Sequence, residues 1–380
     1  MSGTGRPWAR PVRIDQVIPS IVERDAVSHH TLEAQRVLRS MGFASEIFAR
    51  DMGPGLAGRV RPLGELPQEG DGSQWVCYQL SIGSPAADVV LAHPGPKIVN
   101  YHNITPAPLV ESWMPLLGDE VRLGRSQLVR LAEVTEMGIG VSRFNTSELV
   151  QAGYRRTAVA PLMVDVANFD PPPDRSKATA LSHEKEGGGA DWLFVGQMLP
   201  HKSHQDVVKA FACFLRAFDP CARLHLIGRE SCPSYAEGIR RYVKALGIAD
   251  SVDLAGSVSS SELAAYYRAA DVLVCCSEHE GFCAPLLEAM RHGVPVVAYG
   301  VAAVPETVLD AGVVLATKMP SVVAAAVHQV LVDRSLRELL VERGTERAAE
   351  FTLERARRAF ADAVGAAVAG GGPARDARAR

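Results

Sequence analysis

The chain has 380 residues, a length that favours two domains over a single hydrophobic core. Apolar residues make up 47% of it, which excludes a disordered chain, and the net charge of −3 argues against a nucleic-acid-binding surface. No apolar run reaches the roughly 18 residues that a membrane-spanning helix needs, so we expect no integral membrane contact and leave peripheral contact open. The N-terminus lacks the apolar core of a signal peptide, which predicts a cytoplasmic protein.

The 7 cysteines indicate reduced, mostly buried thiols. Their number is odd, no two of them are spaced as C-x2-C, and several fall within apolar strand or helix patterns. We therefore expect neither a disulfide framework nor a metal site. The oligomeric state is not indicated by the sequence.

The first part of the chain alternates between strand and helix patterns. Val12 to Ile18 predicts a strand, Ser28 to Met41 a helix with an apolar stripe, and Ala44 to Ala49 a second strand. This βαβ unit requires a parallel sheet. The loop before the helix lacks the glycine-rich dinucleotide fingerprint, so we expect no NAD or FAD. Asp25 in this loop is either a helix cap or a ligand-binding residue.

Polar residues follow two later strand patterns. The strand from Lys97 to Tyr101 continues into His102 and Asn103, at the edge where parallel sheets bind ligands. His102 is therefore a candidate ligand-binding residue, with a structural histidine as the alternative. Arg143 begins a predicted helix directly after the next strand and is either an anion-binding or a solvated side chain.

A change of composition predicts the domain boundary. Residues 169–189 contain three consecutive prolines, mixed charges and a glycine triplet, which is typical of a linker. We predict an N-terminal domain at 1–168, a linker at 169–189 and a second domain at 190–350. A terminal helix at 351–367 and a disordered tail at 368–380 complete the chain.

The second domain repeats the strand–helix alternation, which predicts another doubly wound parallel sheet. Its predicted strands are Asp191–Val195, Leu224–Ile227, Val252–Leu254 and Asp271–Cys276. Its predicted helices are Gln205–Phe218, Ser234–Leu246, Ser261–Ala269 and a short helix that Pro285 opens.

The turn before Pro285 is the most informative feature of the sequence. A strand that turns directly into a helix is where open α/β proteins hold phosphates, because free amides and the helix dipole point at the ligand. Two carboxylates, Glu280 and Glu288, flank this turn. The stretch from Glu280 to Glu288, EGFCAPLLE, resembles the E-x7-E signature of the family 4 retaining glycosyltransferases, and Gly293–Val297 continues the resemblance.

The resemblance covers nearly the whole second domain and implies the GT-B fold. In this α/β fold, two Rossmann-like doubly wound domains face each other across a cleft. The nucleotide lies on the C-terminal domain and the acceptor largely on the N-terminal one. The terminal helix is expected to cross back to the N-terminal domain.

The same resemblance implies which residues bind the donor. Phe194–Gln197 followed by Lys202 is similar to a family segment whose arginine and lysine hold the donor diphosphate, but Gln197 replaces the arginine. The diphosphate would then depend on Lys202 and the helix N-terminus. The implied donor-binding residues are Gly196, Gln197, Lys202, Gly256, Val258, Glu280, Gly281, Phe282, Cys283 and Glu288. For Cys283, a small apolar filler is the alternative interpretation.

The acceptor side and the catalytic residues are implied in the same way. The acceptor-side residues are Asp25, His29, His102, Asn103 and Arg143. The catalytic residues are His102, Lys202 and Glu280.

The expected reaction is transfer of a sugar from a nucleotide-diphosphate donor to an acceptor hydroxyl with retention of configuration. The acceptor would be a small molecule, a natural product or a glycan. The expected donor is a UDP- or GDP-sugar, and we expect no cofactor and no metal, because a fixed cation and backbone amides can stabilise the leaving group. Two alternatives share these motifs: coupling of a nucleotide-activated cyclitol to an amine, and non-catalytic binding of a sugar nucleotide.

Overall fold

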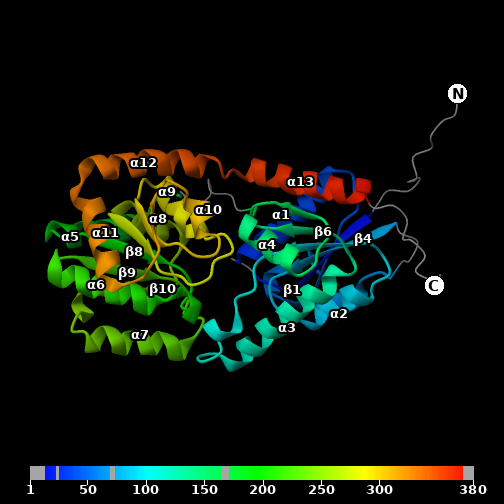
Figure 1. Ribbon diagram of the computed structural model, residues 1–380, viewed down its shortest axis with the longest axis horizontal. Helices are drawn as coiled ribbons and strands as arrows, with labels where there is room; N and C mark the ends of the chain where they lie inside the picture. Colours follow the sequence, from blue (N-terminus) through cyan, green and yellow to red (C-terminus); the bar gives the residue numbers. More distant parts are fainter. Residues whose placement is uncertain (1–12, 23–24, 69–72, 164–170, 371–380) are drawn as a thin grey trace. The chain divides into compact units, whose positions relative to one another are not determined.

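The computed structural model describes residues 13–22, 25–68, 73–163 and 171–370. It divides the chain into two compact units (Figure 1). Unit 1 comprises Met1–Ile104, Asp119–Val164 and Leu353–Arg380, and unit 2 comprises Thr105–Gly118 and Asp165–Thr352. Residues 368–370 of the predicted tail are helical, which corrects that part of the prediction, and the rest of the tail, from residue 371 onward, lies outside the described residues.

Unit 1 is built on a parallel 7-stranded sheet with the strand order β3-β2-β1-β4-β5-β6-β7. Its strands are β1 (Arg13–Ile21), β2 (Ile47–Met52), β3 (Arg61–Pro62), β4 (Gln74–Leu80), β5 (Lys97–Tyr101), β6 (Thr135–Gly140) and β7 (Thr157–Val159). Its helices are α1 (Ala26–Ser40), α2 (Pro85–Ala92), α3 (Pro115–Ala132), α4 (Arg143–Gln151) and α13 (Leu353–Gly370), of which α3 begins in the segment that belongs to unit 2.

Unit 2 is built on a parallel 6-stranded sheet with the order β10-β9-β8-β11-β12-β13. Its strands are β8 (Asp191–Val195), β9 (Arg223–Ile227), β10 (Val252–Gly256), β11 (Val272–Cys275), β12 (Val296–Tyr299) and β13 (Val313–Leu315). Its helices are α5 (Arg175–Glu186), α6 (His204–Ala217), α7 (Pro233–Ala245), α8 (Ser260–Ala269), α9 (Ala284–Arg291), α10 (Val304–Val308), α11 (Pro320–Val332) and α12 (Arg334–Ala349).

Both sheets are assembled from buried apolar runs joined by capped helices. All five residues of β5 are buried, as are all four of β11. Ser259 and Glu262 form a reciprocal capping box at the start of α8, which satisfies two otherwise unpaired amides. The strand order reverses between β1 and β4 in unit 1, and between β8 and β11 in unit 2. Open α/β sheets bind ligands at the carboxyl edge beside such reversals.

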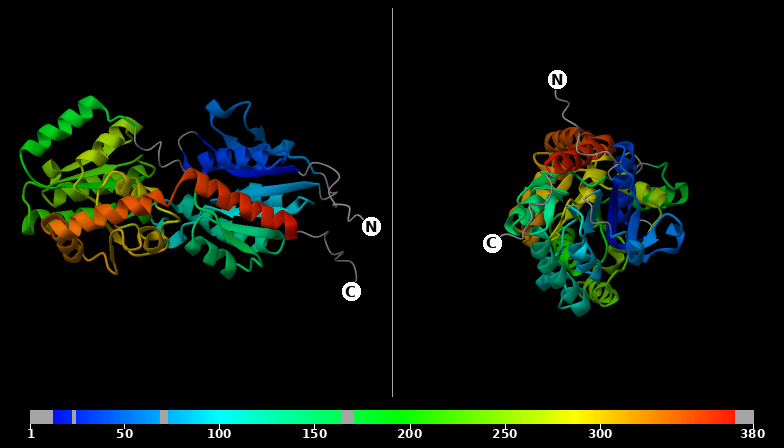
Figure 2. Two further views of the ribbon diagram at one scale, coloured as in Figure 1. Left: turned by 90° about the horizontal axis from the view of Figure 1, so that it is seen from above. Right: turned by 90° about the vertical axis from the view of Figure 1, so that its right-hand side faces the viewer.

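Helix α13 belongs to unit 1, although it follows the last helix of unit 2 in the sequence. Figures 1 and 2 show it in red beside the strands of this unit. Phe360 and Val364 are fully buried in a core that includes Ile14 and Leu38. Arg357 pairs with the buried Glu33 of α1. The C-terminal segment thereby completes the core of the first domain.

Two features of the predicted domain plan are wrong. The predicted linker at 169–189 contains α5, which packs on α8, buries Leu181 and donates from Lys177 to the Tyr266 hydroxyl at 3.2 Å. Residues 105–118, which we assigned to the N-terminal domain, belong to unit 2, where Trp113 packs against Tyr235 with ring centroids 5.4 Å apart. The remaining part of the predicted boundary, at 164–170, lies outside the described residues.

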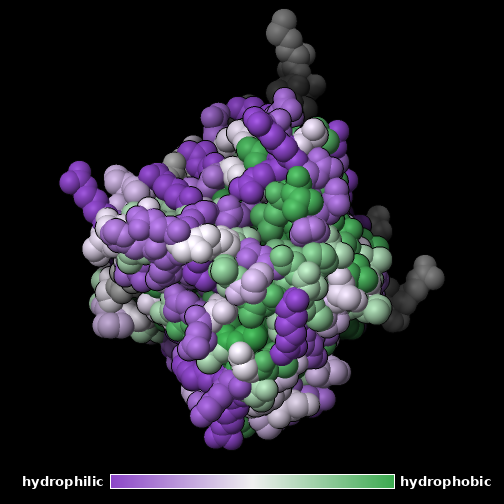
Figure 3. All heavy atoms as spheres, turned by 90° about the vertical axis from the view of Figure 1, so that its left-hand side faces the viewer, coloured by the Kyte–Doolittle hydropathy of each residue, from purple (hydrophilic) through white to green (hydrophobic). Residues whose placement is uncertain are grey.

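The face of the protein drawn in Figure 3 mixes hydrophilic and hydrophobic side chains. Phe218, at the end of α6, is 41% exposed, yet its ring stacks on His328 of α11 at 4.1 Å. Within the described residues, no helix combines the length and the apolar content needed to cross a bilayer.

Candidate active site

A buried ion pair lies at the strand-order reversal of unit 2. Lys202 ends a short 3-10 helix (Pro200–Lys202) after β8, and Glu280 lies in the loop after β11. The Lys202 Nζ donates to both carboxylate oxygens of Glu280, at 2.7 and 2.8 Å. Strands β8 and β11 are neighbours in the sheet, so residues 78 positions apart meet at one edge. Two of the three side chains that the motifs predict to be catalytic, Lys202 and Glu280, are therefore in contact.

The electrostatics of this pair keep the lysine charged. The Lys202 side chain is 21% exposed and that of Glu280 is 7% exposed. Burial lowers the pKa of Lys202, but the Glu280 carboxylate outweighs burial, so the pKa is raised overall. The ammonium group thus remains available to an anionic ligand that approaches from its solvent-facing side.

The backbone of the loops after β8, β9 and β10 is held together by hydrogen bonds beside Lys202. The Gly196 N–H donates to Ile227 at 2.8 Å, and the Gly228 N–H donates to Gly256 at 2.9 Å. Gly228 has φ +151°, and a Cβ there would lie 1.9 Å from the Gly196 carbonyl oxygen, so only glycine fits. Val258 is half-buried two residues beyond Gly256.

Arg229 is a candidate residue that the sequence did not reveal. Its Nη2 donates to the Gln197 Oε1 at 3.3 Å, and the Ser231 Oγ donates to the same oxygen at 2.7 Å. Arg229 is exposed, and it directly follows Gly228. A guanidinium is therefore held beside Gln197, where the family pattern has an arginine. Finding it requires the pairing of β8 with β9, which no single motif encodes.

The loop before α9 has a fixed backbone and leaves the N-terminus of the helix without a side-chain cap. No side chain caps this helix, and Cys283, its N-cap, has φ +62° in the left-handed region. The Thr307 hydroxyl donates to the Phe282 carbonyl at 2.9 Å, and the Ala303 N–H donates to the Glu280 carbonyl at 3.2 Å. These contacts fix the backbone from Glu280 to Cys283 at a helix N-terminus that favours an anion.

Glu288, the second carboxylate of the motif, is buried on α9. The hydroxyl of Tyr267 donates to its Oε2 at 2.7 Å. Burial raises the pKa of Glu288 to about 7, although the Tyr267 hydrogen bond opposes the rise. Tyr267 in turn stacks on His292, with ring centroids 5.0 Å apart. Glu288 is thus poised to change its charge near neutral pH.

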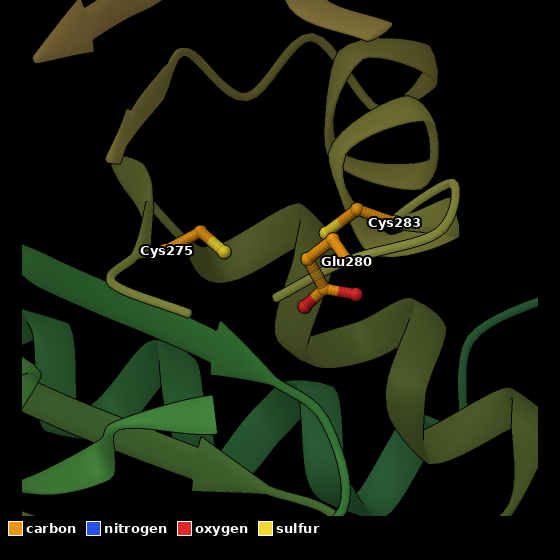
Figure 4. A group of neighbouring side chains, drawn as sticks. All are labelled: Cys275, Glu280 and Cys283. Carbon is orange, nitrogen blue, oxygen red and sulfur yellow. The ribbon is translucent and has the colours of Figure 1, made fainter. Parts of the chain in front are cut away.

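Three side chains at the same edge have the chemistry of metal ligands. Cys275, Glu280 and Cys283 are buried, and one ligand atom from each lies within 4.8 Å of the other two (Figure 4). A hydrogen bond from Cys283 lowers the pKa of the Cys275 thiol, against the opposing effect of burial. From the sequence we expected no metal site, and Cys283 was predicted to be either a donor-binding residue or a small apolar filler.

In unit 1, His102 is part of a buried polar network at the carboxyl edge of the sheet. Its Nε2 lies 2.6 Å from the Gln79 Oε1, which also accepts from the Asn100 Nδ2 at 3.0 Å. Asn100 contacts the His30 Nε2 at 2.6 Å, and the His30 ring lies edge-on to His102 at 4.8 Å. Burial lowers the pKa of His102 to about 3, so the imidazole is neutral.

One nitrogen of the His102 ring is unpaired among the described residues. Its Nδ1 is buried and has no hydrogen-bond partner within the described part of the chain. An unpartnered buried nitrogen at this edge suits a ligand hydroxyl better than a purely structural role. His30 and Gln79, which position the ring, were not predicted, because their convergence depends on the order of the strands.

The other predicted acceptor-side residues occupy the same edge of unit 1 or its loops. Asp25 caps α1 by accepting from the backbone and the hydroxyl of Ser28, at 2.8 and 2.9 Å, which is the alternative left open by the sequence. Asn103 has φ +81° and accepts from Asn145 at 2.9 Å. His29 and Arg143 are exposed. Contact of these residues with an acceptor stays a prediction.

A cavity of about 490 Å³ lies in unit 2, and neither Lys202 nor Glu280 lines it. Pro200 and Glu278, which neighbour Lys202 and Glu280 in the sequence, line it together with the rings of Trp113, Tyr235 and Tyr242. A mixture of aromatic faces and a few polar groups is typical of small-molecule sites.

Comparisons with known proteins identify the family and the fold. The family model of glycosyl transferases group 1 matches residues 178–347. A D-inositol 3-phosphate glycosyltransferase of Kineococcus radiotolerans is 32% identical over 302 residues, covering 72% of this chain and 67% of that protein. One of Geodermatophilus obscurus is 28% identical over 387 residues, covering 89% and 84%. The crystal structure of Anabaena HepE in complex with UDP-glucose has a TM-score of 0.72 at 16% identity, covering 93% of this chain and 99% of HepE.

The two doubly wound units and the structural likeness define a protein of the GT-B fold. The chain belongs to the glycosyl transferases group 1 family and is a glycosyltransferase. The fold and the family implied by the sequence motifs are thereby confirmed.

Proposed function

We propose that the protein transfers a sugar from a UDP- or GDP-sugar to an acceptor hydroxyl, with retention of configuration and without a metal cofactor. The observation that carries the proposal is the contact of Lys202 with Glu280 at the strand-order reversal, beside the uncapped N-terminus of α9. A cation and free amides at this place suit a diphosphate. The UDP-glucose complex of the structurally similar HepE supports a sugar nucleotide as the ligand.

Each site residue has a part in this reaction. Lys202 and the amides of Gly281 to Cys283 stabilise the charge that develops on the leaving diphosphate. Glu280 orients the hydroxyls of the donor sugar, and Glu288 accepts from the ribose hydroxyls. In unit 1, the free Nδ1 of His102 accepts from a hydroxyl of the sugar or acceptor. As the glycosidic C–O bond breaks, the acceptor oxygen bonds to the anomeric carbon on the same face, and its proton passes to the leaving phosphate oxygen.

A panel of donors tests the proposal. Unfolding temperature is measured with UDP-glucose, UDP-N-acetylglucosamine, GDP-mannose and ADP-glucose, because a ligand that binds only the folded state stabilises it by mass action. At a concentration 100 times its dissociation constant, the correct donor adds about 2.7 kcal/mol to the free energy of unfolding. Product formation is then followed by mass spectrometry with D-inositol 3-phosphate as the first acceptor, because two relatives carry that name.

The outcome also separates the alternatives. Donor binding without turnover on any acceptor would favour a non-catalytic binder, and coupling to an amine would favour cyclitol transfer. No response to any sugar nucleotide would contradict the proposal. We further propose that the protein works in the cytoplasm, which its 7 free cysteines support, since reduced thiols persist there.

Arg229 is expected to bind the donor diphosphate in place of the family arginine, whose position in this chain is occupied by Gln197. Replacing Arg229 with Ala should weaken donor binding by about 10–100-fold, the loss of one charge-assisted hydrogen bond. Restoring an arginine in the variant Gln197→Arg/Arg229→Ala should recover most of the affinity, as measured by calorimetry with the donor found in the panel. Arg241→Ala is the matched control, because Arg241 lies on the exposed face of α7 and pairs only with Glu237 among the described ion pairs. Unchanged affinity in Arg229→Ala would exclude this role.

A further inference from the structure

Cys275 and Cys283, which lie on either side of the active-site loop, are close enough to bind a common ligand. Cys275 ends β11, Cys283 precedes α9, and Figure 4 shows their side chains directed toward each other with Glu280 alongside. Among the described residues this is a group of three buried potential ligands whose binding atoms lie within 4.8 Å of one another. All three belong to unit 2.

The backbone conformation of Cys283 indicates that this residue does more than fill space in the core. Its φ of +62° lies in the left-handed region, where a side chain costs about 1 kcal/mol relative to glycine. Strained non-glycine residues cluster at functional sites. Glycine would give the same turn without the strain, so the sulfur itself accounts best for a cysteine here.

We propose that Cys275, Glu280 and Cys283 form a binding site for a thiophilic divalent cation, Zn²⁺ above all, and that its occupation inhibits donor binding. Cysteine sulfur and carboxylate oxygen are preferred zinc ligands, and ligand atoms about 2.0–2.3 Å from one ion fall within the observed mutual spacing. Three protein ligands leave the fourth tetrahedral position open to water.

The charges of the occupied site balance. On binding, the two thiols release their protons to solvent, and two thiolates with the Glu280 carboxylate carry three negative charges. The ion and the Lys202 ammonium carry three positive charges. Glu280 has two oxygens, so one can bind the ion while the other keeps its hydrogen bond to Lys202. No oxidant or reductant is involved.

Inhibition follows from what the ion would engage. It would hold the Glu280 carboxylate and fix the residue that begins the anion-binding turn of α9. A donor that hydrogen-bonds to Glu280 and to the Cys283 amide would then bind more weakly, because the ion already holds this loop. This consequence rests on the proposed function, whereas binding of the ion does not.

The binding test uses the full-length, reduced protein. Zn²⁺ binding is measured by calorimetry, and Cd²⁺ binding by the ultraviolet charge-transfer band of a cadmium–thiolate bond. We expect one tight ion per chain. Cys275→Ser and Cys283→Gly should each weaken Zn²⁺ binding by at least about 100-fold, since even outer-shell changes cost 10–100-fold. Glycine suits the backbone at 283, so this variant should fold.

The matched control is Cys276→Ser, which removes a buried thiol adjacent to Cys275 that is not part of the group. It should bind Zn²⁺ as the parent chain does. Equal binding by the parent chain and both site variants, or no tight binding by the parent chain, would overturn the proposal. In a second measurement, Zn²⁺ should raise the apparent dissociation constant of the donor found in the panel at least tenfold in the parent chain and not in Cys283→Gly. An equal rise in both would exclude inhibition through this site while leaving the donor assignment intact.

Discussion

Replacing Lys202 with Met is expected to lower kcat/KM by at least about 10³-fold. The ammonium is the fixed cation nearest the proposed leaving group, and the loss of one such stabilising group costs about 10²–10³ in rate alone. Donor affinity should fall as well, because the diphosphate loses its charged partner. Steady-state kinetics with the donor found in the panel measures both effects.

The same substitution should destabilise the fold, for a separate reason. It leaves the Glu280 carboxylate, 7% exposed, without the two hydrogen bonds that Lys202 donates. Breaking a buried pair by removing one partner costs about 3–5 kcal/mol, and we expect the low end because Lys202 itself is 21% exposed. Chemical denaturation monitored by circular dichroism gives this change in the free energy of unfolding.

A double variant separates the two effects. Lys202→Met/Glu280→Gln has no unpaired charge, so its stability should return to within about 1 kcal/mol of the parent chain while its activity stays low. The control is Lys177→Met on α5, which loses a hydrogen bond to the Tyr266 hydroxyl and a cation–π contact with the same ring and should keep full activity. Activity that recovered together with stability in the double variant would show that Lys202 only neutralises Glu280.

The sequence predicted the sheets better than the domain plan. Buried strands such as β8 and β11 contain short apolar runs of aromatic and β-branched residues between polar loops, a length and composition that favour a strand. Helix α5 was missed because it buries only Leu181, and three prolines precede it. The assignment of residues 105–118 failed because it depends on where Trp113 finds an aromatic partner, which is a tertiary contact.

For the candidate active site, the sequence motifs predicted individual residues but not the side chains that these residues contact. Lys202 and Glu280 were each predicted from a local pattern, yet their ion pair exists because β11 lies next to β8 while β9 and β10 lie on the other side. Arg229 beside Gln197 and Tyr267 beside Glu288 depend on strand order and helix packing in the same way. One sequence contains no signal for such contacts, because they join segments far apart in the chain.

Replacing Glu288 with Gln is expected to stabilise the protein above neutral pH and to weaken donor binding. The pKa of Glu288 rises from 4.5 to about 7 on folding, so between these values the folded state holds a proton that the unfolded state has lost. Stability therefore falls as pH rises through this window, by about 3 kcal/mol once the pH exceeds 7. Glutamine does not titrate, and the Tyr267 hydroxyl can still donate to its amide oxygen.

Donor binding should change in the opposite direction. Ribose hydroxyls donate to the ionised carboxylate, and the fraction ionised rises about tenfold between pH 6 and pH 8 for a pKa near 7, so donor affinity should rise by that factor. The Glu288→Gln variant should bind the donor about 10–100-fold more weakly at pH 8, with no dependence on pH in this range. Calorimetric titrations at pH 6, 7 and 8 measure both quantities.

The variant Tyr267→Phe is the matched control. It removes the hydrogen bond that lowers the pKa of Glu288, so that pKa should rise further and the increase in donor affinity should shift to higher pH. A parent chain whose stability does not decline between pH 5 and pH 8 relative to Glu288→Gln would contradict the assignment of the titrating group. Equal donor affinity in the parent chain and Glu288→Gln at pH 8 would place the ribose elsewhere on unit 2, because a buried carboxylate that met the ribose hydroxyls could not be neutralised without loss.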